Sequence, residues 1–232
     1  MIIKEERIGN QRLILGDCLE VMPTLGRFDA VVTDPPYGIG RAAGMGGGGV
    51  RLAGDTRRYS ASTWDDGRPP QEAFDAMLAA GVLHIVWGGN YFADALPQSG
   101  KWLFWDKCQT MPSYSDGELA WTSLSGESVK QFTYNGSGMQ AKEKNRVHPT
   151  QKPVALMEWC LGFLPDAKTI LDPFAGSGTT AVACQRMGRH GTGVELDEEY
   201  WRIACERVHK AWQQPDLLIP ETQAPPTQDK LL

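Results

Sequence analysis

Short apolar runs rich in β-branched and aromatic residues alternate along the chain with longer segments whose apolar residues recur every three or four positions. The short runs predict strands at residues 12–15, 30–33, 82–87, 102–105, 119–122, 169–171 and 192–195. The longer segments predict helices at residues 71–80, 153–163, 179–187 and 198–212. Such alternation is typical of a mostly parallel sheet with helices on both faces, so the pattern predicts an α/β fold and argues against all-α and all-β folds.

Two polar segments interrupt this alternation. Residues 38–70 contain the run Gly46 to Gly49 and several arginines, and a loop of this length inside a compact domain is usually functional or mobile. Residues 123–147 are basic and dotted with glycine, and Phe132 and Tyr134 stand two apart, as on one face of a strand. We expect a mobile loop in the first segment and a small insertion in the second, both facing the substrate.

The composition is that of a soluble globular protein, since 41% of the 232 residues are hydrophobic and 22% are charged. We expect one domain over residues 1–212 and a disordered tail over residues 213–232, where four prolines stand among glutamines and acidic residues. No window approaches the roughly 18 apolar residues of a membrane span, and the acidic start does not suit a signal peptide, which predicts a cytoplasmic protein. Five scattered cysteines without a Cys-x-x-Cys pair argue against disulfides and structural zinc and predict reduced, mostly buried thiols.

Basic residues gather in two segments of an acidic chain. The formal net charge is −5, yet residues 41–58 hold four arginines against one aspartate, and residues 128–152 hold five lysines and arginines against one glutamate. A polyanion responds to such a local excess rather than to the net charge, although two solvated loops would show the same pattern. The candidate nucleic-acid contacts are Arg41, Arg57, Arg58, Lys130, Lys142, Lys144 and Arg146.

Residues 169–180 combine a predicted strand, a Gly-x-Gly turn and the start of a predicted helix. Such a turn lets the backbone pass close to a ligand. Glu195 ends the next predicted strand 17 residues after Gly178, near the roughly 20-residue spacing at which a carboxylate meets ribose hydroxyls. The third glycine of a dinucleotide fingerprint is absent, as is Gly-Lys-Ser/Thr, so neither NAD nor a nucleoside triphosphate is the best fit. An ordinary turn followed by a helix-capping glutamate would look the same.

An earlier strand ends at Asp34 to Tyr37, which reads Asp-Pro-Pro-Tyr. Pro35 and Pro36 fix their own dihedrals and push the preceding residues into extended geometry, which predicts a rigid loop. It stands at the carboxyl end of a strand, where open α/β sheets bind ligands. Asp34 and the Pro35 carbonyl suit the two hydrogens of an amino group on a planar ring, and Tyr37 suits stacking on that ring. A turn without chemical meaning is the alternative.

Together these two segments resemble the amino-methylating DNA methyltransferases that use S-adenosylmethionine. Their order, with the Asp-Pro-Pro-Tyr loop ahead of the glycines, is that of the circularly permuted group often called the beta class. The resemblance covers roughly residues 12–208 and implies a Rossmann-like methyltransferase fold, mostly parallel, with permuted motif order. Further matching segments are Leu15 to Leu19, Val86 to Phe92, His148 to Pro153 and Gly193 to Asp197.

The resemblance also implies roles for individual residues. It places Glu195 on the ribose of the cofactor and Asp17 on its adenine amino group. It places Lys152 near its carboxylate, although a solvated lysine before a helix would fit the sequence as well, and His148 has the weaker case because it can simply pack. The implied catalytic residues are Asp34, Pro35, Pro36 and Tyr37, and the implied cofactor-binding residues are Asp17, Cys18, Asp34, Thr150, Lys152, Asp172, Phe174, Gly176, Ser177, Gly178, Thr179, Glu195 and Leu196.

The implied reaction is methylation of adenine N6 in double-stranded DNA, on a base that has flipped out of the duplex. Cytosine-N4 methylation is the closest alternative, although serine more often replaces Asp34 there. Methylation of RNA or of a protein amide, an inactive nucleic-acid-binding protein and a nicotinamide dehydrogenase stay open. Residues 123–147 are shorter than the family's usual recognition insert, which predicts a short target or a second subunit in a homodimer. The resemblance favours a solitary enzyme of a bacterial or phage-infected cell, without a metal.

Overall fold

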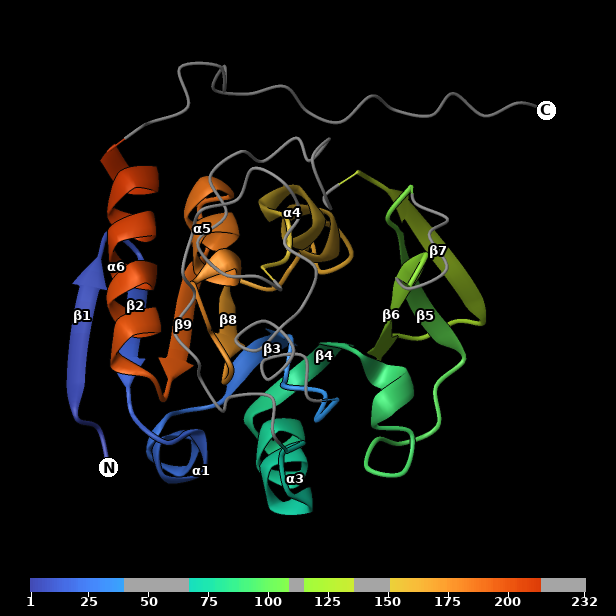
Figure 1. The fold of residues 1–232 in the computed structure, drawn as a ribbon, viewed down its shortest axis with the longest axis horizontal. Coiled ribbons are helices and arrows are strands. Elements are labelled where there is room, and N and C mark those ends of the chain that lie inside the picture. The colour runs from blue at the N-terminus through green and yellow to red at the C-terminus, as the bar shows by residue number, and fades with distance from the viewer. Residues whose placement is uncertain (40–66, 109–114, 136–150, 214–232) are drawn as a thin grey trace, which may run out of the picture.

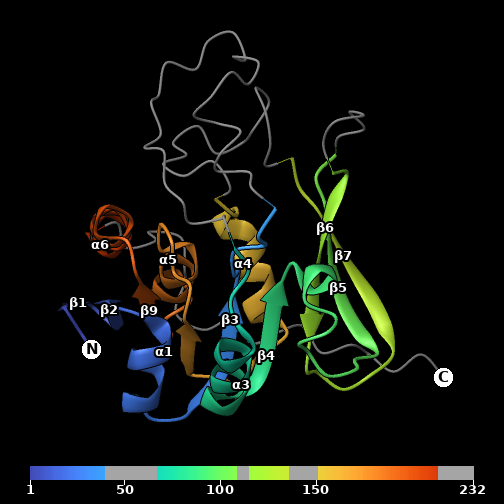
Figure 2. The same cartoon turned by 60° about the horizontal axis from the view of Figure 1, so that its bottom comes forward.

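The computed structural model of the chain describes residues 1–39, 67–108, 115–135 and 151–213. Within these residues, one sheet carries helices on both faces (Figure 1 and Figure 2). Its strands are β1 (Lys4–Ile8), β2 (Gln11–Leu15), β3 (Phe28–Thr33), β4 (Gly81–Trp87), β5 (Lys101–Asp106), β6 (Gly117–Thr122), β7 (Ser128–Thr133), β8 (Thr169–Asp172) and β9 (His190–Glu195). The helices are α1 (Cys18–Val21), α3 (Gln71–Ala80), α4 (Val154–Gly162), α5 (Thr179–Arg186) and α6 (Glu198–Gln213), with 3-10 turns η1 (Met22–Thr24) and η2 (Gly89–Tyr91).

Every predicted strand and helix is present, with ends that differ by at most two residues. Strands β1 and β7 were not predicted, because both lie at edges of the sheet and most of their side chains point to solvent rather than into a core. Strand β7 belongs to the segment expected to be an insertion, so the first part of that segment is an edge strand of the main sheet. The remainder of that segment, most of the expected mobile loop and the expected tail lie outside the described residues.

The order of strands across the sheet is β1-β2-β9-β8-β3-β4-β6-β5-β7, with only β1 and β6 running against the others. From β8 the chain passes through α5 to β9 on one side, whereas from β3 it passes through α3 to β4 on the other. The direction of winding therefore reverses between β8 and β3. In open α/β sheets, ligands bind in the crevice outside the carboxyl ends of the strands at such a switch point.

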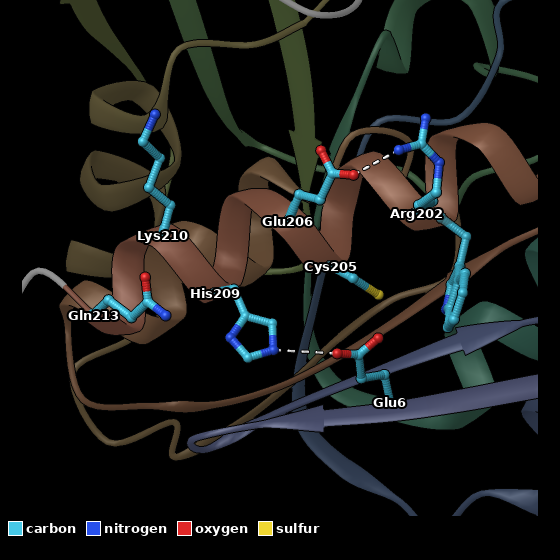
Figure 3. A pocket seen from close by; sticks show the side chains of 8 residues that line it. Glu6, Arg202, Cys205, Glu206, His209, Lys210 and Gln213 are labelled. Carbon is cyan, nitrogen blue, oxygen red and sulfur yellow. Dashed lines mark hydrogen bonds and ion pairs between the residues drawn. The ribbon is translucent and has the colours of Figure 1, made fainter.

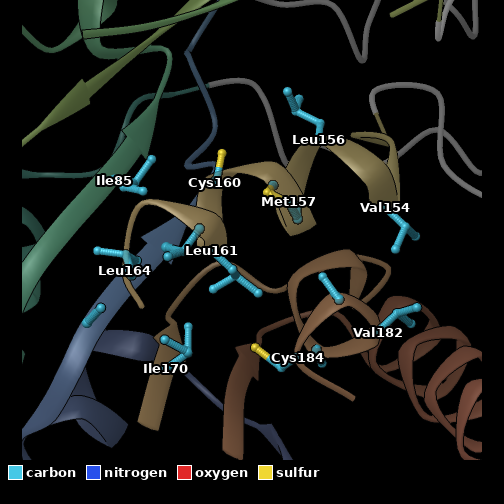
Figure 4. Packing of buried hydrophobic residues seen from close by; sticks show 14 of the residues in the cluster. Ile85, Val154, Leu156, Met157, Cys160, Leu161, Leu164, Ile170, Val182 and Cys184 are labelled. Carbon is cyan, nitrogen blue, oxygen red and sulfur yellow. The ribbon is translucent and has the colours of Figure 1, made fainter. Parts of the chain in front are cut away.

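A hydrophobic core lies on each face of the sheet. One core packs α4, α5 and α6 against the strands, and Figure 4 shows Leu161 and Val182 among its residues. The other packs α3 and the α1 region, with Phe74 as its largest helical contribution. Neighbouring strand residues alternate between the two, as Ile170 and Leu171 do on β8. Burying one such side chain contributes roughly 1.5–3 kcal/mol, which holds the central strands, and hence their carboxyl ends, in a rigid frame.

Candidate active site

Four carboxylates line one edge of the sheet. Strands β2, β9, β8 and β3 are adjacent and parallel, so their carboxyl ends share that edge. Asp17 follows β2, Glu195 ends β9, Asp172 ends β8 and Asp34 follows β3. The order across the sheet is therefore Asp17, Glu195, Asp172, Asp34. The last two flank the crevice at the switch point, so the structure brings together predicted site residues that are far apart in the chain.

A carboxylate of the neighbouring strand holds the glycine turn between β8 and α5. The two oxygens of Glu195 accept hydrogen bonds from the amides of Gly176, at 2.7 Å, and Asp197, at 2.8 Å. Gly176 and Gly178 adopt left-handed φ values of 51° and 76°. A Cβ at Gly178 would lie 2.8 Å from the Cβ of Ala204 on α6, whereas a Cβ at Gly176 would meet no atom within 4 Å. Gly178 thus permits helix packing, and Gly176 leaves backbone open to a ligand.

Arg207 of α6 supports the same turn and was not predicted from the sequence. Its Nη1 donates hydrogen bonds to the Ser177 carbonyl at 2.5 Å, the Ser177 hydroxyl at 2.8 Å and the Thr179 hydroxyl at 3.1 Å. Ser177 and Thr179 are accordingly buried, with their hydroxyls engaged by protein. Their predicted contact with the cofactor stays a prediction. No local pattern marks Arg207, because its partners lie about thirty residues away.

Asp172 ties the two strands of the crevice together. One of its oxygens accepts hydrogen bonds from the Thr33 hydroxyl at 2.6 Å and from the Phe174 amide at 3.1 Å. Burial raises the pKa of Asp172 to about 6, against the lowering effect of the hydrogen bonds from Thr33 and the Phe174 amide. The Thr33 contact fixes the carboxyl end of β8 against that of β3, and the Phe174 contact begins the turn.

Asp17 caps the short helix α1 at the far end of the same edge. Its Oδ1 accepts a hydrogen bond from the Leu19 amide at 2.8 Å, and the Gly16 amide donates to the Glu195 carbonyl at 2.9 Å. Burial, assisted by the charge of Asp17, raises the pKa of the Cys18 thiol to about 11, so this cysteine stays protonated at neutral pH. Leu196, which follows Glu195, is exposed.

Asp34 lies in a buried cluster of charges rather than standing alone. Lys152 Nζ donates to Asp34 Oδ2 at 2.6 Å and to the Tyr37 hydroxyl at 3.0 Å, and that hydroxyl donates to Asp34 Oδ1 at 2.6 Å. Lys152 is 5% exposed. The structure thus joins Lys152 to Asp34 by a buried ion pair, while its role toward the cofactor carboxylate stays a prediction. Desolvation by burial raises the pKa of Asp34, and the Lys152 charge opposes this rise.

Two further members of the cluster, Glu118 and Lys107, were missed by the sequence analysis. Glu118 Oε2 lies 2.8 Å from Lys152 Nζ, and Glu118 Oε1 pairs with Lys107 Nζ. The positive charges of Lys152 and Lys107 outweigh burial and lower the pKa of Glu118 to about 2. Glu118 is the second residue of β6 and Lys107 follows β5, and nothing in the local sequence distinguishes them from solvated charges at strand ends.

The Tyr37 ring forms part of an aromatic wall. Tyr91 of η2 stacks on it with 4.8 Å between ring centroids, and Phe92 contacts it edge-on at 6.0 Å. Gly88 is required beside the ring, because a Cβ there would collide with it. Tyr37, Tyr91 and Phe104 line a cavity of about 390 Å³ together with Asn90 and Glu118. Its volume is within the range of small-molecule sites, and its lining combines aromatic rings with carboxylate and amide groups.

The predicted nucleic-acid contacts fall mostly outside the described residues. Lys130 is described and is exposed on the edge strand β7, while Thr150 and His148 are not described. The expected face pairing of Phe132 and Tyr134 is confirmed by their stacked rings, 5.7 Å apart, although both pack toward the core. The basic residues outside the description are Arg41, Arg57, Arg58, Lys142, Lys144 and Arg146.

A second hollow of about 510 Å³ lies between α6 and β1, away from the carboxylates. His209 of α6 pairs there with Glu6 of β1, at 3.2 Å, and Figure 3 shows the two side chains between the helix and the strand. The described part of the chain contains no group of His, Cys, Asp or Glu side chains arranged for a metal, and no described helix is long and apolar enough to cross a membrane. All five cysteines are free thiols, of which Cys160, Cys184 and Cys205 are buried and Cys108 is exposed.

Similar folds exist among solved methyltransferase structures. TTHA0409 from Thermus thermophilus, a putative DNA modification methylase in complex with S-adenosyl-L-methionine, is 20% identical, with a TM-score of 0.53 over 85% of this chain and 94% of that one. The PvuII DNA methyltransferase (cytosine-N4-specific) is 15% identical, with a TM-score of 0.58 over 92% of this chain and 95% of that one. These likenesses confirm the predicted Rossmann-like methyltransferase fold.

Sequence comparison gives the family. The putative methylase YubD of Escherichia coli (strain K12) is 30% identical over 88% of this chain and 93% of its own length. The model of the N6_N4_Mtase family, described as DNA methylase, matches residues 86–206, which excludes the Asp34 loop but includes Lys152 and the glycine turn. Because that match spans more than half of the chain, and because YubD is similar over nearly its full length, the chain belongs to the N6/N4 family of DNA methylases.

Proposed function

We propose that this protein transfers a methyl group from S-adenosylmethionine to the N6 amino group of adenine in double-stranded DNA. The observation that carries the proposal is the position of Asp34 and Tyr37. Both lie on a loop at the carboxyl end of β3, and β8, whose glycine turn is open over Gly176, is the adjacent strand. A hydrogen-bond acceptor and a stacking ring for a base thus stand next to a turn suited to a nucleoside cofactor.

The residues of the edge fit S-adenosylmethionine. The open backbone at Gly176 leaves room for a ligand, and Phe174 and Gly178 belong to the same turn. Each oxygen of the Glu195 carboxylate accepts one amide hydrogen bond and retains a lone pair for a ribose hydroxyl. The cofactor supplies an electrophilic methyl group on a sulfonium centre when it is bound. Asp17 belongs to the same row of carboxylates, two strands from the crevice. It would accept a hydrogen bond from the adenine amino group of the cofactor.

The chemical task of the loop is to make an amino group nucleophilic. The lone pair of an exocyclic nitrogen is delocalised into the ring, so the nitrogen is a poor nucleophile. Hydrogen bonds from its two hydrogens to Asp34 and to the Pro35 carbonyl favour a pyramidal nitrogen and localise that lone pair. These bonds strengthen as positive charge develops on the nitrogen in the transition state, which is where stabilisation accelerates transfer.

The stacked rings of Tyr37 and Tyr91 would together hold the target base outside the duplex. A base inside the double helix cannot reach Asp34, so it must flip out at a cost of a few kcal/mol. Stacking on an aromatic side chain contributes about 1–3 kcal/mol and offsets part of that cost. Phosphate contacts by Lys130 and by the basic residues of the two polar segments would supply further binding free energy.

Adenine is favoured over cytosine because position 34 is aspartate, whereas serine is more common there in the cytosine-N4 enzymes that the chain resembles. Cytosine N4 is the second candidate, since the fold is shared with a cytosine-N4-specific enzyme. The same loop would activate either amino group, so the two candidates differ in the base and not in the chemistry.

Incubation with labelled S-adenosylmethionine and unmethylated bacterial DNA, followed by digestion and mass identification of the nucleosides, tests the proposal. We expect N6-methyldeoxyadenosine with the parent, none with Asp34→Ala, and cofactor binding that is mostly retained in the variant. Asp166→Ala is the matched control, because Asp166 is an exposed carboxylate that precedes β8 at the opposite edge of the sheet. N4-methyldeoxycytidine in its place would make cytosine the target base, and full activity of Asp34→Ala would overturn the proposed catalytic site.

A further inference from the structure

Four charges alternate through the interior beside the target pocket. Lys107 pairs with Glu118, Glu118 pairs with Lys152 and Lys152 pairs with Asp34. The side chains of Lys152 and Lys107 are 4% and 8% exposed, and those of Glu118 and Asp34 are 16% and 22% exposed. The cluster is therefore neutral as a whole but strongly charged within, which is the arrangement that makes buried charges tolerable. Only Asp34 belongs to the proposed catalytic loop.

The Lys152 ammonium has no donor to spare. It carries three hydrogens, and three acceptors surround it: Asp34 Oδ2 at 2.6 Å, Glu118 Oε2 at 2.8 Å and the Tyr37 hydroxyl at 3.0 Å. Glu118 thus accepts one of the three ammonium hydrogens. The cation lies between two carboxylates and is shared by them.

We propose, on the basis of the proposed function, that Glu118 is a positioning residue for methyl transfer, which holds the Lys152 ammonium so that Asp34 keeps a free acceptor position for the target amino group. Each oxygen of Asp34 accepts one hydrogen bond, from Tyr37 or from Lys152, and retains a second lone pair. Without Glu118, the third hydrogen of the ammonium would lose its acceptor and would turn toward Asp34, which already accepts one of the other two. Lys107 secures Glu118 in turn, because it binds the other oxygen of that carboxylate.

The charges around Asp34 agree with this role. The groups that face it are Lys152, Glu118, Tyr37 and, from β8, Asp172. Lys152 lowers the pKa of Asp34, whereas burial and Glu118 raise it. Glu118 itself stays ionised throughout the working range of pH, because Lys152 and Lys107 lower its pKa to about 2. A fixed negative charge beside Asp34 strengthens it as a hydrogen-bond acceptor and brings its ionisation closer to neutral pH.

The test is the pH profile of single-turnover methyl transfer at saturating cofactor and DNA. For Glu118→Gln we expect the rate to fall at least tenfold, the cofactor dissociation constant to stay within twofold, and the acidic limb of the profile to move to lower pH. For Lys152→Met the acidic limb should move to higher pH, because this variant removes the positive charge that lowers the pKa of Asp34. Variants that are merely less stable would lose active protein without moving either limb.

Glu118→Gln leaves Lys107 buried without its carboxylate, so the double variant Lys107→Gln/Glu118→Gln is measured beside it. This variant removes one charge of each sign and should show the same shift toward lower pH. Glu127→Gln, at an exposed position before β7, is the control for a surface glutamate. The positioning role is overturned if the double variant keeps the acidic limb of the parent, or if its rate stays within twofold of that of the parent. A parent that transfers no methyl group to DNA overturns the proposed function and this role together.

Discussion

The backbone amide of Gly176 donates a 2.7 Å hydrogen bond to Glu195 Oε2, which joins the glycine turn after β8 to the end of β9. A second amide, that of Asp197, binds the other oxygen. The carboxylate thus shapes the turn that would hold the cofactor. Each of its oxygens also retains a lone pair, which would accept a hydrogen bond from a ribose hydroxyl. Burial outweighs both hydrogen bonds and raises the pKa of Glu195 to about 7.

Glu195→Ala should weaken the binding of S-adenosylmethionine. The variant removes the carboxyl acceptor for the ribose and also the support of the Gly176 amide. Hydrogen bonds to charged groups contribute about 1.5–3 kcal/mol, so we expect the dissociation constant to rise roughly 10- to 100-fold. Isothermal titration calorimetry measures it, with Glu199→Ala as the control at an exposed position on α6. Equal affinity of Glu195→Ala and the parent would remove Glu195 from the cofactor site.

The raised pKa of Glu195 makes the stability of the ligand-free protein depend on pH. Between its ordinary pKa of 4.5 and the folded value of about 7, the folded state holds a proton that the unfolded state has released. Stability from this group is therefore present at low pH and is lost as the pH rises through that window, by about 3 kcal/mol in total. Urea unfolding at pH 5 and pH 7.5 should show a smaller loss for Glu195→Gln than for the parent. Equal losses would contradict the assignment.

The two glycines of the turn should respond differently to alanine. Gly178→Ala adds a methyl group 2.8 Å from the Ala204 Cβ at a φ of 76°, so overpacking and backbone strain together should cost about 2–4 kcal/mol of folding free energy. Gly176→Ala meets open space at a φ of 51° and should cost about 1 kcal/mol. It should nevertheless weaken cofactor binding, because the methyl group fills the open side. Chemical denaturation and calorimetry on both variants separate the two effects, and similar stability losses would contradict the prediction.

Thr33→Val should destabilise the protein by about 1–2 kcal/mol, because Asp172 would lose the hydrogen bond that it accepts at 2.6 Å in a buried site. The substitution keeps the shape and the β-branch of the side chain, so little packing is lost. Thr33→Ser, which retains the hydroxyl, is the matched control and should keep the hydrogen bond. If urea unfolding gave the same midpoint for Thr33→Val and the parent, the hydrogen bond would contribute nothing to the joining of β3 and β8.

The local sequence already contained the fold class, and it marked several of the residues that the structure brings to the crevice. Buried strands and amphipathic helices show their periodicity in adjacent residues, which is why each predicted element was found. Residue type alone indicates special backbone geometry at Gly176, at Gly178 and at the prolines after Asp34. Strand β1 carried no such signal and β7 only the pair Phe132 and Tyr134 at its end, because an edge strand that faces solvent needs no regular apolar face.

Only the tertiary structure decided which charges meet. Lys152 and Asp34 are 118 positions apart, and their ion pair depends on the loop after β3 and the segment before α4 reaching the same crevice. Glu118 and Lys107 resemble ordinary surface charges until β5 and β6 bring them against Lys152. A charge pair draws its strength from burial and mutual distance, and both are properties of the packed sheet rather than of neighbouring residues in the chain.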